Sequence, residues 1–228
     1  MSDLVQKNTL FGDTLLIRDG THDDKVLSGI GEYISLGIQS CDVVLDIGAH
    51  LGAFTNLALN KGASKVVGYE PHPDNLRVYR ANYGTDSRVC IYECAVSDKI
   101  GTATLWVAEH KRTYAHSLEI TKGYKGVLRR PIQVESVSWE TAFSCDPHII
   151  KIDIEGSEFT LAISKPIIPI SVRSIAIEFH LSRKRWLGVS FPAVKSYLAE
   201  QGFTLVSSKD ASYFGMSSLQ IYTRGARS

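Results

Sequence analysis

The sequence predicts an α/β protein built on a mainly parallel sheet. From residue 42 onward, short apolar runs alternate with amphipathic stretches, which is typical of β-α-β units. The chain has 228 residues, long enough to bury a core without help from a metal or disulfides. No internal repeat or low-complexity segment interrupts it. We therefore expect a single domain over residues 1–228, with residues 1–40 as an N-terminal extension.

The N-terminal extension is expected to hold a small hairpin followed by a helix. The hairpin would run from Leu10 and Phe11, through a turn at Gly12 and Asp13, to an apolar run at 15–17. Apolar residues then recur at helical spacing and predict a helix over about 23–36. Two glycines inside this stretch, at 29 and 31, weaken that prediction.

The remaining elements follow from their apolar patterns and turn residues. Strands are expected at 42–48, 65–70, 89–96, 103–108, about 132–137, 148–156, 174–180, 203–208 and 218–223, the last two as an antiparallel hairpin. Helices are expected at 53–61, 73–83, from 157 onward and at about 191–201. Pro73 suits a first helical turn, and Gly202 suits a helix end. Residues 109–131 have no clean period and are expected to form an insertion or lid.

Charge and composition exclude several classes of protein. Lys and Arg total 25 against 24 Asp and Glu, a net charge of +1, so no global basic field favours nucleic acid or a membrane. The N-terminus does not resemble a signal peptide, and no run of 18 apolar residues occurs. We expect a cytoplasmic protein with no membrane partner. Its cysteines form no C-x-x-C pair and are expected to be reduced: Cys41, Cys90, Cys94 and Cys145.

The run from Asp46 to Gly52, DIGAHLG, lies between an expected strand and an expected helix. Glycines at 48 and 52 let the backbone approach a ligand closely. Glu70 ends the next strand, 24 residues after Asp46, where an acid can accept hydrogen bonds from ribose hydroxyls. Asp46 would repel a pyrophosphate but suits a cationic sulfonium, which favours S-adenosylmethionine (SAM) over a dinucleotide. The alternative is that the glycines only shape a tight turn.

Four motifs, VVLDIGAHLG, VVGYEPHPDN, ECAVSD and HIIKIDIEGSE, together resemble the FkbM-like SAM-dependent methyltransferases. The resemblance runs from about residue 42 to 180 and depends most on the last motif. It implies a Rossmann-like class I methyltransferase fold and O-methylation of a hydroxyl on a sugar or natural product.

The resemblance also implies which residues bind the cofactor. Asp46, Gly48 and Gly52 would line the methionine end of SAM, and Glu70 would bind its ribose. His50 belongs to the same turn, at a position where the family more often has Asn. The remaining cofactor contacts implied are Ala95 and Val96 beside the adenine, and Ser117.

Charged residues at two further strand ends predict the reaction centre. In 149–156, isoleucines alternate with Lys151, Asp153 and Glu155, and Glu178 and His180 repeat this pattern at 174–180. If the strands are neighbours, these charges meet in one cleft. We expect Asp153 at the methyl-transfer centre, also beside the cofactor, with Glu178 near it and His180 as the base, because its ordinary pKa is about 6.5.

Two other interpretations of this cluster remain open. Asp153, Glu178 and His180 would suit a divalent metal that activates a hydroxyl, although we expect no metal requirement. The charges could also form a buried ion-pair network around Lys151 that takes no part in a reaction.

The expected lid is rich in basic residues, which suggests an anionic acceptor. The segment contains one acidic residue, Glu119, and six basic residues: Lys111, Arg112, Lys122, Lys125, Arg129 and Arg130. The favoured function is a SAM-dependent O-methyltransferase acting on a small-molecule hydroxyl. The alternatives are a methyltransferase for the ribose 2′-hydroxyl of a nucleic acid, and a SAM-binding regulatory domain without turnover.

Overall fold

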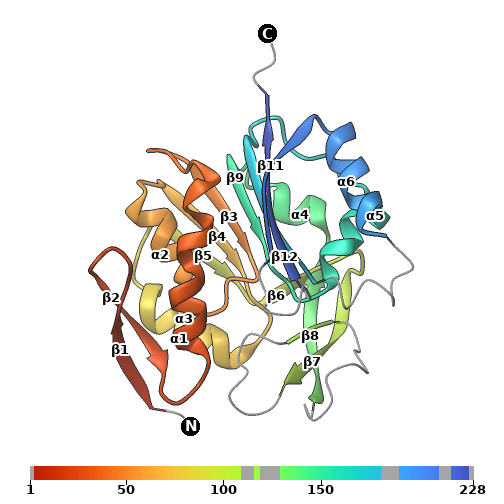
Figure 1. Cartoon of the computed structure of the whole chain (residues 1–228). Helices are drawn as coiled ribbons and strands as arrows, with labels where there is room; N and C mark the ends of the chain where they lie inside the picture. Colours follow the sequence, from red (N-terminus) through yellow and green to blue (C-terminus); the bar gives the residue numbers. More distant parts are fainter. Residues whose placement is uncertain (1–2, 109–115, 119–128, 181–189, 211–216, 226–228) are drawn as a thin grey trace.

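A computed structural model describes residues 3–108, 116–118, 129–180, 190–210 and 217–225. Its centre is a seven-stranded sheet in the order β11-β12-β10-β9-β3-β4-β5 (Figure 1). β12 runs antiparallel to both of its neighbours, and the other pairings are parallel. The strands are β3 (Val43–Ile47), β4 (Lys65–Tyr69), β5 (Val89–Tyr92), β9 (Ile149–Ile152), β10 (Ser174–His180), β11 (Phe203–Asp210) and β12 (Ser217–Arg224). The predicted mainly parallel sheet and the C-terminal hairpin are confirmed.

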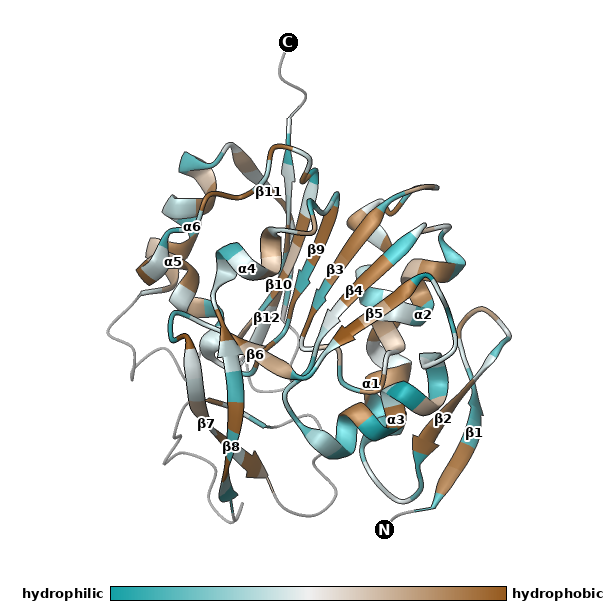
Figure 2. Ribbon diagram, turned by 180° about the vertical axis from the view of Figure 1, so that it is seen from behind, coloured by the Kyte–Doolittle hydropathy of each residue, from teal (hydrophilic) through white to brown (hydrophobic). Residues whose placement is uncertain are grey.

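Helices cover both faces of this sheet, and its central strands are largely hydrophobic (Figure 2). One buried cluster packs the sheet against α1 (Asp23–Gly29), the 3-10 helix η1 (Ile30–Leu36), α2 (Ala53–Asn60) and α3 (Pro73–Tyr83). The other packs it against α4 (Trp139–Phe143), α5 (Leu161–Ser164) and α6 (Phe191–Glu200). Apolar side chains therefore fill both faces, as a parallel sheet requires. The predictions missed α4.

The N-terminal hairpin exists, but its first strand lies earlier than predicted. β1 (Leu4–Asn8) pairs antiparallel with β2 (Thr14–Arg18). Leu10 belongs to the turn instead and is 59% exposed. The turn is closed by a hydrogen bond from the Thr9 backbone N–H to the Asp13 carbonyl oxygen. The helix predicted over 23–36 divides into α1 and η1 at Gly29, the first of the two glycines that weakened it.

The strand predicted over 89–96 is two strands that belong to different sheets. β5 ends at Tyr92, and β6 (Cys94–Val96) joins a three-stranded sheet with β7 (Gly101–Ala108) and β8 (Arg129–Val137). The chain leaves the main sheet at Glu93, the one charged residue of this run. β9 ends at Ile152, before the predicted residue 156, and is followed by a turn and the 3-10 helix η2 (Ser157–Thr160).

Of the predicted insertion at 109–131, the structure describes only residues 116–118 and 129–131. The lid prediction, with four of its six basic residues, lies outside the described residues. None of the helices in the described part of the chain is long and apolar enough to cross a membrane.

Candidate functional site

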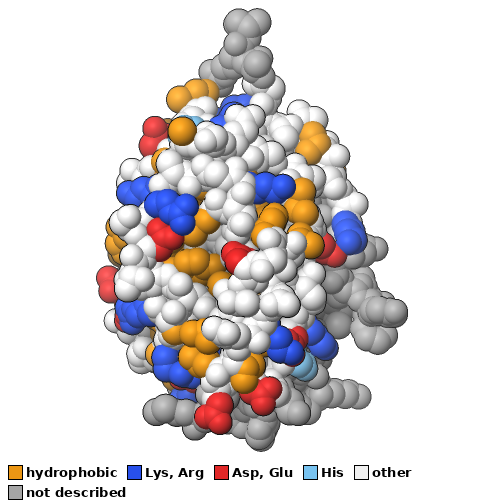
Figure 3. All heavy atoms as spheres, turned by 90° about the vertical axis from the view of Figure 1, so that its left-hand side faces the viewer, with side chains coloured by type: hydrophobic (Ala, Val, Ile, Leu, Met, Phe, Trp, Pro, Cys, Tyr) orange, Lys and Arg blue, Asp and Glu red, His pale blue; other side chains and the backbone are white. Residues whose placement is uncertain are grey.

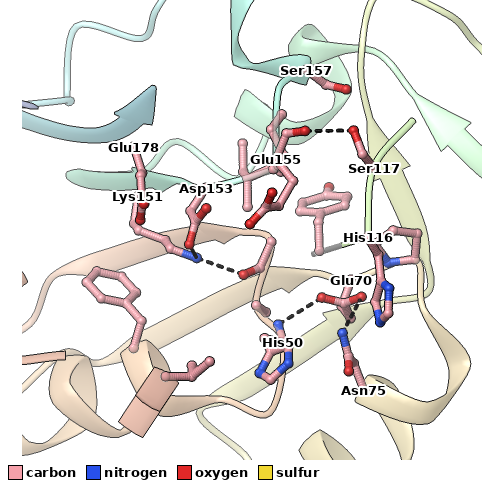
Figure 4. A pocket seen from close by; sticks show the side chains of 18 of the residues that line it. His50, Glu70, Asn75, His116, Ser117, Lys151, Asp153, Glu155, Ser157 and Glu178 are labelled. Carbon is pink, nitrogen blue, oxygen red and sulfur yellow. Dashed lines mark hydrogen bonds and ion pairs between the residues drawn. The ribbon is translucent and has the colours of Figure 1, made fainter. Parts of the chain in front are cut away.

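A cavity of about 430 Å³ opens at the carboxyl ends of β3, β4, β9 and β10. Parallel sheets bind ligands at this edge. Residues 116–118 and the N-terminal helices α1 and η1 also contribute to its walls. Figure 4 shows two groups of polar side chains in it. One contains Glu70, Asn75, His50 and His116, and the other contains Lys151, Asp153 and Glu178.

The turn after β3 brings its backbone against the turn after β9. Gly48 has φ +86°, and a Cβ added there would lie 1.9 Å from the Asp153 carbonyl oxygen. Gly52 has φ +93°, and a Cβ there would lie 2.5 Å from the Tyr83 ring. Both positions therefore require glycine for packing as well as conformation. Gly48 lines the cavity, whereas Gly52 packs behind it and is not among the lining residues.

Asp46 is buried behind the same turn. Its Oδ1 lies 3.2 Å from Lys151 Nζ, and Lys151 also donates a 2.7 Å hydrogen bond to the Gly48 carbonyl oxygen. Burial raises the pKa of Asp46, and the nearby ammonium opposes this shift. Asp46 has no exposed surface and does not line the cavity. The geometry therefore gives it a supporting position under the turn.

Glu70 holds the loop between β4 and α3 and also faces the cavity. Its Oε2 accepts from the His50 backbone N–H at 2.9 Å, and its Oε1 accepts from the His72 backbone N–H at 2.8 Å and from Asn75 Nδ2 at 3.2 Å. A carboxylate can accept about four hydrogen bonds, so capacity remains for a ligand. Ala95 and Val96, also predicted here, line the same cavity.

The N-terminal hairpin and α1 contact the turn after β3 through three buried polar residues. Arg18 forms two side-chain hydrogen bonds with Asp23, at 2.8 and 2.9 Å, and its Nη2 lies 3.3 Å from His50 Nε2. His50 itself has φ +52°. The sequence analysis missed Arg18 and Asp23; the one available signal was a charged residue ending the apolar strand LLIR.

Four carboxylates surround the ring of His180, as the sequence predicted for three of them. Nε2 lies 3.3 Å from Glu155 Oε1 and 3.9 Å from Glu178 Oε1. Asp153 belongs to the same group, with a side chain 30% exposed. Nδ1 lies 3.2 Å from Oε1 of Glu158, which is fully buried and was missed. The signal available for it was the last acid of the IDIEGSE motif, two residues after its glycine.

These carboxylates set the ionisation of the cluster. Although burial opposes the charged ring, Glu155 and Glu158 hold the pKa of His180 well above 6.5. Burial and the charge of Asp153 raise the pKa of Glu178 to about 8. The role of His180 as a base stays a prediction, and its surroundings oppose it because a protonated imidazole has no lone pair to accept a proton.

Residues 116–118 are fixed to both halves of the cavity. Ser117 donates a 2.6 Å hydrogen bond to the Glu155 carbonyl oxygen, and its backbone pairs with Trp106. The His116 ring stacks on His72 with ring centroids 4.0 Å apart. Ser117 lines the cavity, and its described side-chain contact is with the chain itself; the cofactor contact implied by the resemblance stays a prediction.

One group of side chains has the composition of a metal site. Asp153, Glu155 and His180 each offer a ligand atom, and these atoms lie within 4.8 Å of one another. The sequence had suggested a slightly different set of metal ligands, with Glu178 in place of Glu155.

The chain was compared with known families and structures. The model of the methyltransferase FkbM domain matches residues 46–205. No curated protein sequence matches the chain.

Three solved structures illustrate the similarity of the fold. A candidate methyltransferase from Escherichia coli is 15% identical, with a TM-score of 0.53, over 98% of this chain and 100% of that one. A candidate S-adenosylmethionine-dependent methyltransferase from Listeria monocytogenes is 14% identical, with a TM-score of 0.51, over 87% and 99%. Methyltransferase FkbM from Methylobacillus flagellatus is 16% identical, with a TM-score of 0.47, over 84% of this chain and 47% of that one. The first two show that the sheet and its helices are arranged as in class I methyltransferases.

Proposed function

The chain belongs to the FkbM methyltransferase family, and we propose that it transfers a methyl group from SAM to a hydroxyl of a sugar or another natural-product small molecule. The observation that supports this most is the meeting of two unlike groups of side chains in one cavity at the strand ends (Figure 4). One group can hold a nucleoside, and the other can receive a hydroxyl.

The cofactor half would consist of the turn after β3 and the loop after β4. Gly48 and Ala49 line the cavity, so the backbone of this turn would be available to the methionine part of SAM. Glu70 would accept from the ribose hydroxyls, since its Oε2 receives only one described hydrogen bond. Ala95 and Val96 would flank the adenine, and His50 and Ser117 would complete the pocket. When bound, SAM supplies an electrophilic methyl group on a sulfonium.

The acceptor half would be formed by Asp153 and Glu178. Their side chains are 30% and 22% exposed, more than that of Glu155 or His180, so they can reach a ligand in the cavity. A carboxylate here can hydrogen-bond the acceptor hydroxyl and receive its proton as the oxygen–methyl bond forms and the carbon–sulfur bond breaks. Holding oxygen, carbon and sulfur in line is the other contribution. His180 would orient Glu155 and Glu178.

The charges of the described lining favour a neutral acceptor. Five carboxylates and three Lys or Arg side chains line the cavity: Glu32, Glu70, Asp153, Glu155 and Glu178, against Lys25, Arg129 and Lys151. An anion beside ionised Asp153 would be repelled, whereas Glu178, with a pKa of about 8, is mostly uncharged at neutral pH. The expected anionic acceptor depended on lid residues, most of which lie outside the described residues. On the face shown in Figure 3, basic and acidic side chains are interspersed, with no single-sign patch that would favour RNA.

The experiment that tests this function combines a variant with an acceptor screen. Methyl-labelled SAM is offered with sugars, natural products and RNA, and we expect label on a small-molecule hydroxyl. Asp153→Asn should lower that turnover by at least about 100-fold, the lower range for a positioned base, while calorimetry shows nearly unchanged SAM binding. Glu135→Gln, an exposed change on β8, is the matched control.

Each other result of the screen identifies an alternative. Label only on RNA ribose would replace the proposal with the nucleic-acid function, and SAM binding without label in any acceptor would favour a regulatory domain. Normal turnover of Asp153→Asn would show that the acceptor half has been misplaced. The cytoplasmic location stays a prediction.

A further inference from the structure

The side chains around His180 are arranged as ligands of one ion. Asp153 and Glu155 follow β9, and His180 ends β10, so two segments that are separate in sequence bring three ligand atoms within 4.8 Å of one another. Two ligands of one Mg²⁺ lie at most about 4.2 Å apart, twice a bond of about 2.1 Å. Nε2 of His180 and Oε1 of Glu155, 3.3 Å apart, are already close to the spacing of about 3.0 Å between adjacent ligands of an octahedral ion of this size.

Glu158 fixes the direction in which His180 would bind. Its Oε1 lies 3.2 Å from His180 Nδ1, and its Oε2 accepts a 2.7 Å hydrogen bond from the Gly156 backbone N–H. The carboxylate is fully buried and cannot turn away. Metal-binding histidines commonly donate their second ring N–H to a carboxylate in this way, which directs the other nitrogen at the metal. Here that other nitrogen, Nε2, is the one that faces Glu155 and Glu178.

A second observation in the same cavity indicates a ligand or an ordered water. Ser157 lines the cavity next to the Glu155 turn, is 1% exposed, and its Oγ has no hydrogen-bond partner among the described residues. A buried hydroxyl without a partner loses hydrogen bonds that water would give it, so such groups call for a water or a ligand. Ions such as Mg²⁺ keep several waters when protein-bound, and those waters could satisfy Ser157.

The local charge also calls for a cation. Glu155 and Glu178 face His180 Nε2, and Asp153 Oδ2 lies 3.9 Å from Lys151 Nζ. Lys151 is closer to Asp46 and to the Gly48 carbonyl, so it is engaged mainly by the turn after β3. Carboxylates that meet in a partly buried place repel one another, and a divalent ion between them would relieve that repulsion.

We propose that Asp153, Glu155 and Nε2 of His180 bind a divalent cation of the Mg²⁺ and Mn²⁺ class, with the His180 ring oriented by Glu158. The ion would take the place of the proton that Nε2 shares with Glu155, so binding releases that proton to solvent. The two carboxylates suit the hard ions Mg²⁺ and Mn²⁺, and a set of only three protein ligands leaves positions for the waters that Mg²⁺ keeps. Next to Asp153 and Glu178, the ion would polarise the acceptor hydroxyl and so help its proton to leave. That role rests on the proposed function, whereas the binding of the ion does not.

The test measures binding of Mn²⁺ to the full chain after treatment with a chelator. Loss of the free-ion electron paramagnetic resonance signal should show one site per chain, and Mg²⁺ should compete for it. Glu155→Gln and His180→Asn should each abolish the site. Glu158→Gln should weaken it about 10- to 100-fold, as changes to supporting carboxylates do. Glu32→Gln is the matched control, because Glu32 lines the same cavity but pairs with Lys209.

Thermal unfolding measured with and without Mn²⁺ distinguishes a variant that cannot bind the ion from one that fails to fold. Mn²⁺ should raise the unfolding temperature of the wild type and of Glu32→Gln, but not that of folded Glu155→Gln. No Mn²⁺ binding at millimolar concentration, or equal binding by Glu155→Gln and the wild type, would overturn the proposal. SAM binding is measured separately in the presence of chelator. A chain that binds SAM but no Mn²⁺ would refute the metal site and leave the proposed function intact.

Discussion

Lys151 and Asp46 are direct partners across β9 and β3, with Nζ 3.2 Å from Oδ1 and both side chains buried. Charged residues inside a parallel sheet are costly, and this pair reduces the cost for each member. Lys151 also binds the Gly48 carbonyl oxygen, so one ammonium group supports both the acid and the turn that follows it.

Replacing Lys151 with Met should lower the free energy of unfolding by about 3–5 kcal/mol, because it leaves Asp46 as an uncompensated buried charge. Urea denaturation measures this loss. The double variant Asp46→Asn with Lys151→Met should recover a large part of it, since no buried charge then remains. An equal loss in the double variant would mean that packing, rather than charge, sets the cost.

Gly48→Ala and Gly12→Ala form a matched pair. Both glycines have φ +86°, but a Cβ at Gly12 meets nothing within 4 Å, whereas one at Gly48 meets the Asp153 carbonyl oxygen. Gly12→Ala should cost only the left-handed conformation, about 1–2 kcal/mol. Gly48→Ala should cost clearly more and should also reduce SAM affinity. Similar urea midpoints for the two variants would contradict the close approach of the two turns.

Glu70→Gln should weaken SAM binding by about 1.5–3 kcal/mol, the range for hydrogen bonds to a charged group. The amide retains one acceptor oxygen for the surrounding backbone but loses the second. Calorimetry with SAM measures the change, and Glu135→Gln should show none. If Glu70→Gln binds SAM normally, the Glu70 carboxylate only stabilises the loop between β4 and α3 and does not contact the cofactor.

His72 should make the protein less stable in mild acid. Burial lowers its pKa to about 4, and neither ring nitrogen has a hydrogen-bond partner in the described part of the chain. Below the ordinary pKa of about 6.5, the unfolded chain therefore takes up a proton that the folded chain does not. Stability is complete above pH 6.5 and falls by up to about 3 kcal/mol as the pH drops to 4.

His72→Phe removes this titration and keeps a ring to stack on His116. Urea unfolding of both proteins from pH 7 to pH 4 should give a flatter profile for the variant. Parallel profiles would show that His72 does not titrate in this range.

Local patterns were sufficient to predict most of the sheet. The runs around β3, β4 and β10 are apolar enough to specify buried strands, and the alternation of charges with isoleucines correctly placed Asp153, Glu155, Glu178 and His180 together. The parallel pairing of β9 with β10 brings these side chains together, because Ile150 pairs with Ile175 and Ile152 with Ile177.

Contacts between distant segments could not be predicted. From the sequence alone, Glu158 resembles any acid at the start of a helix; its role appears only because β10 brings His180 next to it. In the same way, Arg18 contacts His50 only because the hairpin packs onto the turn after β3. The division of 89–96 between two sheets likewise depends on β8, which lies more than 30 residues further along the chain.

The wall formed by α1 and η1 comes from residues that precede the family match, which begins at residue 46. The turn after β3 and the loop after β4 belong to the matched part. A substitution in the first 45 residues can therefore reshape one wall of the cavity and, through Arg18, alter the support of His50, although it lies outside the part that defines the family.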